Sequence, residues 1–142
     1  MADARSISLV CANEASLWAE LQARASVVAK AEPALAPMLQ RYVLDRSGFG
    51  EGIIQRLAER ITPTGQDLPV ILRVLGEAVA SDREVLSQMR ADIRATLERD
   101  PATEHALIPY LWYKGFHAIS MHRPLGFERH QNHSFQQLEF RS

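Results

Sequence analysis

Apolar residues recur at spacings of three and four along most of this 142-residue chain, and that periodicity is the strongest constraint on its fold. Breaks that contain proline or glycine, such as Thr62-Pro63-Thr64-Gly65, separate the periodic segments. No alternating strand pattern of useful length competes with them, and no internal repeat is visible. The sequence therefore predicts an all-α fold, a bundle of about six helices.

The apolar periodic segments and the breaks between them give approximate bounds for these helices. The expected segments are residues 14–31, Pro33 to the break at Ser47-Gly48, 53–61, a helix after Asp67, Ser81 to Asp100, and one from about Thr103 to Arg123. The glycine-rich stretch Gly48-Phe49-Gly50-Glu51-Gly52 is interpreted as an interhelical turn, because it follows a helix and lacks the strand and lysine of a phosphate loop.

The fourth and fifth helices carry the clearest start signals. Asp67 is in place to cap the fourth helix, and Ser81-Asp82-Arg83-Glu84 matches the capping box that opens the fifth. The fourth helix also has a wide apolar face, so we expect it to lie centrally. That face comprises Val70, Ile71, Val74, Leu75, Ala78 and Val79.

Composition limits the class of protein. The net charge of −1 leaves no basic surplus for phosphates, so neither nucleic acid nor an anionic membrane is an expected partner. The lone Cys11 suits a reducing compartment, and no signal peptide or membrane-length apolar run is present, which favours a soluble cytoplasmic protein. We expect a flexible N-terminus over residues 1–13, one helical domain over 14–123, and a poorly ordered, atypical tail over 124–142.

Several residues invite a functional interpretation that the pattern does not favour. His130 and His133 lie one helical turn apart, but they lack the further ligands of a metal site, so no metal ligand is expected. His117 lies on an apolar helix face, where a structural role is favoured over a catalytic one. Trp112 and Tyr113 are expected to anchor the core or an interface rather than to stack on a ligand.

Asp100 is the strongest candidate for a binding residue. In Asp100-Pro101-Ala102, proline disfavours the helical conformation for the residue before it, so Asp100 is expected to end its helix and to display its carboxylate on a corner. The negative end of the helix dipole opposes a carboxylate there by ~0.3–1 kcal/mol. Two interpretations follow: a solvated stop signal, or a site for a cation or an ammonium group.

The motifs around this corner resemble one family. Asp92-Ile93-Arg94, Arg99 through Ala102, and the stretch from Pro109 to Ala118 with its Lys-Gly-Phe-His-Ala core are similar to the N-terminal helical domain of bacterial serine acetyltransferases. The resemblance is weak from residue 14, strong from Asp92, and continues to Arg123.

The resemblance implies a function and a separate role for each of the two domains of the family. The family transfers an acetyl group from acetyl-CoA to the hydroxyl of L-serine, a step of cysteine biosynthesis. Its helical domain joins trimers into a hexamer, and a left-handed β-helix of hexapeptide repeats carries the catalytic histidine and the coenzyme site. By resemblance, Asp100 is a substrate-binding residue, whereas no catalytic, cofactor-binding or metal-binding residue is assigned to this chain.

The β-helix pattern does not follow Arg123. The sequence is therefore expected to represent a truncated product, a frameshifted tail or an expressed fragment that binds no acetyl-CoA and is inactive alone, and whether it is an enzyme stays open. The alternative is a stand-alone helical module that associates with itself, or with full-length serine acetyltransferase subunits, through the apolar faces of its first four helices.

Overall fold

The protein was analysed as a computed structural model, which describes the backbone of residues 4–125 and the side chains of residues 16–124. All regular structure in the described part is helical, so the all-α prediction is confirmed. The elements are α1 (Ala4–Ala31), the 3₁₀ turn η1 (Pro33–Leu35), α2 (Ala36–Leu39), the π-helical segment η2 (Gln40–Leu44), α3 (Phe49–Ile61), α4 (Leu68–Ser81), α5 (Glu84–Arg99), α6 (Leu107–Trp112) and α7 (Lys114–Leu125).

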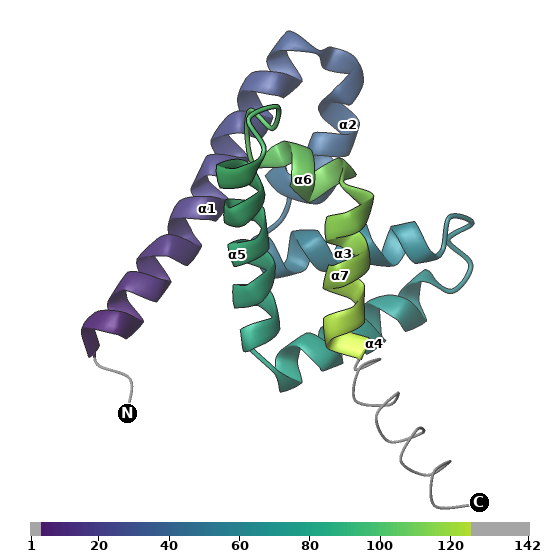
Figure 1. Cartoon of the computed structure of the whole chain (residues 1–142). Coiled ribbons are helices and arrows are strands. Elements are labelled where there is room, and N and C mark those ends of the chain that lie inside the picture. Colours follow the sequence, from purple (N-terminus) through teal and green to yellow (C-terminus); the bar gives the residue numbers. More distant parts are fainter. Residues whose placement is uncertain (1–3, 126–142) are drawn as a thin grey trace, which may run out of the picture.

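The long helix α1 lies beside α5 on one side of the domain, and α3 and α4 form a hairpin against which α7 packs (Figure 1). Helix α1 begins at Ala4, ahead of the start expected at residue 14. The segment from Ala4 to Ala31 holds neither glycine nor proline, so nothing in it interrupts a helix. The helix ends where Glu32 leaves the α region before Pro33, as proline requires of its predecessor.

The second predicted helix has the expected limits but consists of three short pieces. Pro33 and Pro37 each remove a backbone donor, which favours short turns over one regular helix. In the π-helical segment the amide of Asp45 donates to the carbonyl of Gln40 at 2.9 Å. The Tyr42 carbonyl then accepts a hydrogen bond from the Tyr110 hydroxyl at 2.8 Å, so this irregular segment is tied to α6.

The stretch from Gly48 to Gly52 was expected to be an interhelical turn, and that prediction is wrong beyond its first residue. Gly48 is the extended N-cap residue, and Phe49 begins α3. Gly52 is buried inside that helix, where a Cβ would collide with the Tyr110 hydroxyl and the Tyr42 carbonyl oxygen. This glycine is required for a close approach between elements rather than for a turn.

The predicted helix caps are replaced by other contacts. Asp67 occupies the N-cap position of α4 without a side-chain capping bond. Ser81 belongs to the end of α4, where its hydroxyl donates to the Glu77 carbonyl at 2.7 Å. The amide of Glu84 donates to the Asp82 carboxylate at 3.1 Å, whereas Arg83, the N-cap residue of α5, makes no side-chain capping bond, so the capping box predicted at Ser81 does not form.

The prediction that α4 lies centrally is also wrong. Only Leu75 and Val79 of its apolar face are buried, whereas Val70 is 52% exposed and Val74 is 36% exposed. The helix packs against α3 and α7 at an edge of the domain, as Figure 1 shows. Its apolar face is wider than the contact available to it, which leaves an exposed apolar strip on α4.

The core gathers around Tyr110 of α6. The ring of Tyr110 is fully buried and lies 5.8 Å from the Phe49 ring and 6.3 Å from the Trp18 ring, measured between centroids. Other fully buried side chains come from α1, α2, α3, α4 and α5. They include Leu17, Leu21, Leu39, Ile53, Leu57, Leu75, Met89 and Ile93.

The sixth predicted helix is two helices. Tyr113 adopts an extended conformation that separates α6 from α7. Because the chain changes direction there, Leu107, Leu111 and Phe116 are buried together while Trp112 remains 40% exposed. Trp112 is therefore not a core anchor, and the alternative role of an interface anchor stays a prediction.

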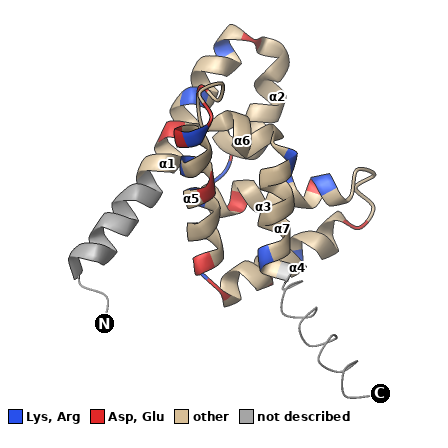
Figure 2. Ribbon diagram, viewed as in Figure 1, with Lys and Arg blue, Asp and Glu red and all other residues tan. Residues whose placement is uncertain are grey.

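The C-terminal helix α7 runs through Pro124 to Leu125, past the point where the sequence pattern changes. The rest of the expected tail, including His130 and His133, lies outside the described residues. Along the described helices, Figure 2 shows basic and acidic residues interspersed. In the same part of the chain, no helix has the length and apolar character needed to cross a membrane.

Candidate functional site

Asp100 lies where the sequence places it, immediately after the last residue of α5. Its backbone is extended, with φ −111° and ψ 100°, and its amide donates to the Thr96 carbonyl at 3.0 Å. The helix therefore stops at the residue before proline, as predicted. The turn closes when the amide of Thr103 donates to the Asp100 carbonyl at 3.0 Å.

The Asp100 carboxylate is held by donors from its own corner. Oδ1 accepts the Ala102 amide at 2.9 Å, and Oδ2 accepts the Thr103 hydroxyl at 2.7 Å. The Tyr113 hydroxyl lies 2.5 Å from the Thr103 hydroxyl and 3.4 Å from Oδ2. Because Thr103 gives its single proton to the carboxylate, Tyr113 donates to Thr103, and the two hydroxyls form a chain that ends on Asp100.

These hydrogen bonds change the electrostatic account of the corner. The Thr103 hydroxyl and the Ala102 amide hold the pKa of Asp100 below its ordinary value. The unfavourable helix dipole is thus offset by local donors, and the carboxylate is ionised at neutral pH. The sequence reasoning missed Thr103 and Tyr113, although a threonine three residues after an aspartate is a recognisable turn signal.

A groove of about 380 Å³ opens beside Asp100 between α5 and α7. Tyr113, Phe116 and Ile119 provide aromatic and aliphatic walls, and Asp92 adds a second carboxylate on the α5 side. Asp92 is already paired with Arg123 of α7. Among the described residues, the groups that lie within hydrogen-bonding distance of the Asp100 carboxylate are all neutral, which suits this carboxylate to a positively charged group.

His117 is a structural histidine, as its position on an apolar face predicts. It is buried, its Nε2 lies 2.7 Å from the Tyr110 carbonyl, and its Nδ1 lies 2.6 Å from Nη1 of Arg60. A carbonyl only accepts and a guanidinium only donates, so Nε2 carries the proton and Nδ1 is the acceptor. Burial lowers the pKa of His117 to about 4, and with both nitrogens engaged the ring has no site for proton transfer.

Within residues 16–124, no three His, Cys, Asp or Glu side chains converge in a way that would hold a metal ion. Gly48 to Gly52 likewise form no phosphate loop, because Phe49 to Gly52 are inside α3 and Gly52 faces Tyr110.

The fold and the corner define a class of protein: a helical domain in which an ionised aspartate, fixed between two helices, borders a small open groove. Comparison with known proteins gives the particular family. The family described as "Serine acetyltransferase, N-terminal" matches residues 17–121, which include α3 to α6 and the Asp100 corner. The chain therefore belongs to the serine acetyltransferase family and corresponds to its N-terminal domain.

Individual relatives agree with this assignment. The serine acetyltransferase of Escherichia coli K12 is 32% identical over 107 residues, which are 75% of this chain and 39% of that protein. The Haemophilus influenzae enzyme is 28% identical over 116 residues, which are 82% of this chain and 43% of that protein. A crystal structure of Neisseria gonorrhoeae serine acetyltransferase in complex with serine superimposes with a TM-score of 0.73 at 30% identity, over 84% of this chain and 51% of that one.

This chain thus spans about two-fifths of the length of its curated relatives and about half of the solved chain. The segment from Asp92 onward, which carries the resemblance in the sequence, lies largely inside the matched region. What is shared is the helical domain, so the activity of the whole enzyme is a separate question.

Proposed function

We propose that this chain supplies the substrate-recognition corner and the assembly surface of a serine acetyltransferase, and that it does not transfer acetyl groups by itself. The observation that carries the proposal is the position of Asp100, ionised and oriented at the mouth of a groove within the family-matched region. L-Serine carries an ammonium group, for which an ionised carboxylate is the matching partner.

The geometry supports an ammonium rather than a larger cation. A carboxylate has about four lone-pair sites. The Ala102 amide and the Thr103 hydroxyl occupy two of them at hydrogen-bonding distances. The remaining sites are left for a compact donor that reaches the carboxylate through the groove. The donors behind Asp100 also fix its direction, so little side-chain entropy is lost when a ligand binds.

The proposed inactivity follows from the chemistry that acetyl transfer needs. A general base must take the proton of the serine hydroxyl while that oxygen attacks the thioester carbonyl. His117 is buried with both nitrogens engaged, so it does not serve as that base. In the family, the catalytic histidine and the coenzyme site belong to the β-helix, and acetyl-CoA is the co-substrate of that part.

A thiol-release assay tests this proposal. Purified protein is incubated with acetyl-CoA with and without L-serine, and free coenzyme A is measured. We expect no serine-dependent release, since His117 is buried with both ring nitrogens engaged and is not available as the base. Serine-dependent turnover that survives repurification would contradict the proposed inactivity, while leaving the family assignment untouched.

The assembly role is a second candidate function, and a specific observation favours it. Val70 is 52% exposed and Val74 is 36% exposed on α4, and both belong to its apolar face. A helix that leaves such a strip uncovered is suited to packing against another chain. We propose that the domain self-associates through this surface and forms mixed oligomers with full-length serine acetyltransferase subunits.

Size-exclusion chromatography with light scattering tests self-association. The native chain is expected to exceed the monomer mass of 16.0 kDa. The variant Val70→Glu/Val74→Glu is expected to shift toward monomer without loss of helical signal. Mixing with full-length E. coli serine acetyltransferase should give mixed species in native mass spectrometry and reduced activity, and unchanged activity over a wide mixing ratio would count against mixed assembly.

A further inference from the structure

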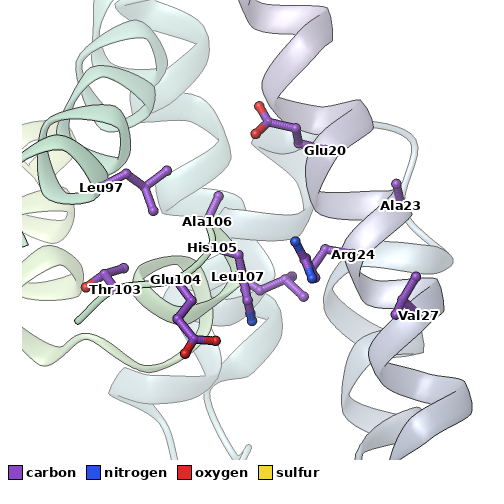
Figure 3. Close-up of a pocket in the computed structure, with 10 residues that line it drawn as sticks. All are labelled: Glu20, Ala23, Arg24, Val27, Leu97, Thr103, Glu104, His105, Ala106 and Leu107. Carbon is purple, nitrogen blue, oxygen red and sulfur yellow. The ribbon is translucent and has the colours of Figure 1, made fainter. Parts of the chain in front are cut away.

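A second cavity lies between α1 and the segment that leads into α6, and it is separate from the groove beside Asp100. Its volume is about 560 Å³, within the range of small-molecule sites. Asp100 does not line it. Figure 3 shows that its walls come from one face of α1, from Leu97 at the end of α5, and from the turn between Thr103 and Leu107.

Arg24 provides a cationic donor in this cavity. Among the described residues its guanidinium forms no hydrogen bond or ion pair, whereas nearby Arg94 pairs with Glu20. Figure 3 shows the Arg24 guanidinium extending from α1 toward His105 and Leu107. A guanidinium presents several N–H groups in a planar fork that matches the two oxygens of a carboxylate.

His105 provides a second polar group. Its Nδ1 is shielded from solvent and has no hydrogen-bond partner among the described residues. Burial and the neighbouring Arg24 lower the pKa of His105, although Glu104 opposes them, so the ring is neutral near pH 7. A buried ring nitrogen without a partner costs free energy, and a ligand oxygen that accepts from an Nδ1–H group would recover it.

The remaining walls define the rest of the ligand. Val27 is 60% exposed beside the cavity, and Leu97 and Leu107 supply further aliphatic surface. Of the two carboxylates that border the cavity, Glu20 is neutralised by its ion pair with Arg94, and Glu104 balances Arg24, so the lining has no surplus positive charge for a multiply charged anion. The lining therefore suits one negative charge attached to a short aliphatic body.

We propose that this cavity binds a small aliphatic monocarboxylate, whose carboxylate pairs with the Arg24 guanidinium and accepts from His105, while its hydrocarbon part contacts Val27 and Leu97. This site lies outside the Asp100 groove and does not depend on the proposed serine recognition. Its occupancy would connect α1 with the turn that leads from Asp100 into α6.

Titration of the full chain with butyrate, followed by ¹H–¹⁵N correlation spectra at constant ionic strength, tests the proposal. Saturable shifts are expected for the amides of Arg24, Val27 and residues 104–107, with no matching response at α4. The amine n-butylammonium and inorganic phosphate serve as comparison probes, the first reversing the charge and the second lacking the aliphatic body. Both are expected to give much weaker shifts in this region.

Variants distinguish specific binding of butyrate in this cavity from nonspecific ion pairing with an exposed arginine. Arg24→Gln is expected to weaken butyrate binding tenfold or more, because a charge-assisted hydrogen bond is lost. Arg24→Lys keeps the charge without the fork and should bind with intermediate affinity. The matched control is Arg73→Gln, which removes an exposed arginine of α4 that pairs with Glu77, and it should bind as the native chain does.

Three outcomes would overturn the proposal. They are shifts that remain linear without saturation, native affinity in Arg24→Gln, and equal responses to butyrate and phosphate. Arg24 is on the exposed side of α1, so its variants are expected to fold, and the dispersion of the same spectra verifies this.

Discussion

Two polar networks hold the C-terminal helices in place, and they are built in opposite ways. At the Asp100 corner, the donors to the carboxylate lie 2 and 3 residues away in the sequence, Tyr113 lies 13 residues away and donates to Thr103, and the carboxylate faces an open groove. At the junction around Tyr110, the hydroxyl of Tyr110 reaches a carbonyl 68 residues away, and Arg60 reaches His117 over 57 residues. The first network shapes a turn, whereas the second joins distant parts of the core.

The difference determines how the two networks respond to mutation. A buried polar group that loses its partner pays its full desolvation cost, because water does not replace the partner. At an open corner, water substitutes for a lost donor. We therefore expect changes at the Tyr110 junction to affect the free energy of unfolding, and changes at the Asp100 corner to affect ligand recognition with little loss of stability.

The largest expected effect is that of Gly52→Ala. The added methyl group meets the Tyr110 hydroxyl and the Tyr42 carbonyl oxygen, and neither a backbone carbonyl nor a buried ring has room to move. Overpacking of this kind should lower the free energy of unfolding by about 3 kcal/mol or more. Urea unfolding monitored by circular dichroism measures the change.

Gly76→Ala is the matched control for this variant. Gly76 lies inside α4, and a Cβ there meets nothing within 4 Å. It should raise the free energy of unfolding by about 0.5–1 kcal/mol, because alanine favours the helix over glycine. If both glycine variants changed stability by the same amount, the close approach at Gly52 would not be the reason for its sensitivity.

Removal of one hydroxyl is expected to have the next largest effect. Tyr110→Phe leaves the ring packing intact but strands the Tyr42 carbonyl in the core, which should cost about 2–3 kcal/mol. Tyr113→Phe makes the same chemical change at the Asp100 corner, where Thr103 and Ala102 still serve the carboxylate, and it should cost about 0.5 kcal/mol. Thermal unfolding of the two variants compares them directly, and equal losses would contradict the distinction between the networks.

The same distinction explains what could be predicted from the sequence. The helix end at Asp100 follows from local chemistry, since proline restricts the residue before it, and the structure agrees. The role of Gly52 was not predictable, because it depends on Tyr110, which is 58 positions away in the sequence and adjacent only in the fold. The glycine pattern alone favoured a turn.

The exposure of the apolar face of α4 could not be predicted from the sequence for a related reason. Its periodicity shows which residues share a face, but not how much of that face another helix covers. Val70 and Val74 look like core residues in the sequence and are exposed in the domain. The predicted capping box at Ser81 does not form because Ser81 is the last residue of α4. Its hydroxyl donates to the Glu77 carbonyl and therefore does not cap α5.

Acid should weaken the Tyr110 junction through His117. The pKa of His117 is lowered to about 4 in the folded state, whereas an unfolded histidine titrates near 6.5, so the unfolded chain binds the proton more readily. Stability is therefore complete above about pH 6.5 and falls as the pH decreases toward 4, with a loss of about 2 kcal/mol by pH 5. Urea unfolding at pH 7.5 and pH 5 measures this loss.

Two variants assign the acid effect to a residue. His117→Gln should be less stable at pH 7.5 but should lose less stability between the two pH values, because the titrating group is gone. His105 also has a lowered pKa, so His105→Gln measures its share of the same change. The carboxylates of Glu59 and Asp100 have lowered pKa values, and their contributions decline only at more acidic pH. An unaltered pH response in His117→Gln would show that the buried histidine is not the cause.

The smallest expected change in stability is at the corner itself. Thr103→Val removes the hydroxyl between Tyr113 and Asp100 while keeping a similar shape, and it should cost about 1 kcal/mol or less in unfolding free energy. With this donor gone, the pKa of Asp100 should rise toward its ordinary value, which ¹³C chemical shifts of the carboxyl carbon measure during a pH titration.

Asp100→Asn is the companion variant, because it keeps an oxygen for the Ala102 amide but removes the charge. If the corner exists to recognise an ammonium group, Asp100→Asn should fold nearly as well as the native chain yet fail to support serine binding in a mixed assembly with full-length subunits. A large loss of stability in Asp100→Asn would instead mean that the aspartate is retained to build the turn, and the two networks would then differ in burial but not in purpose.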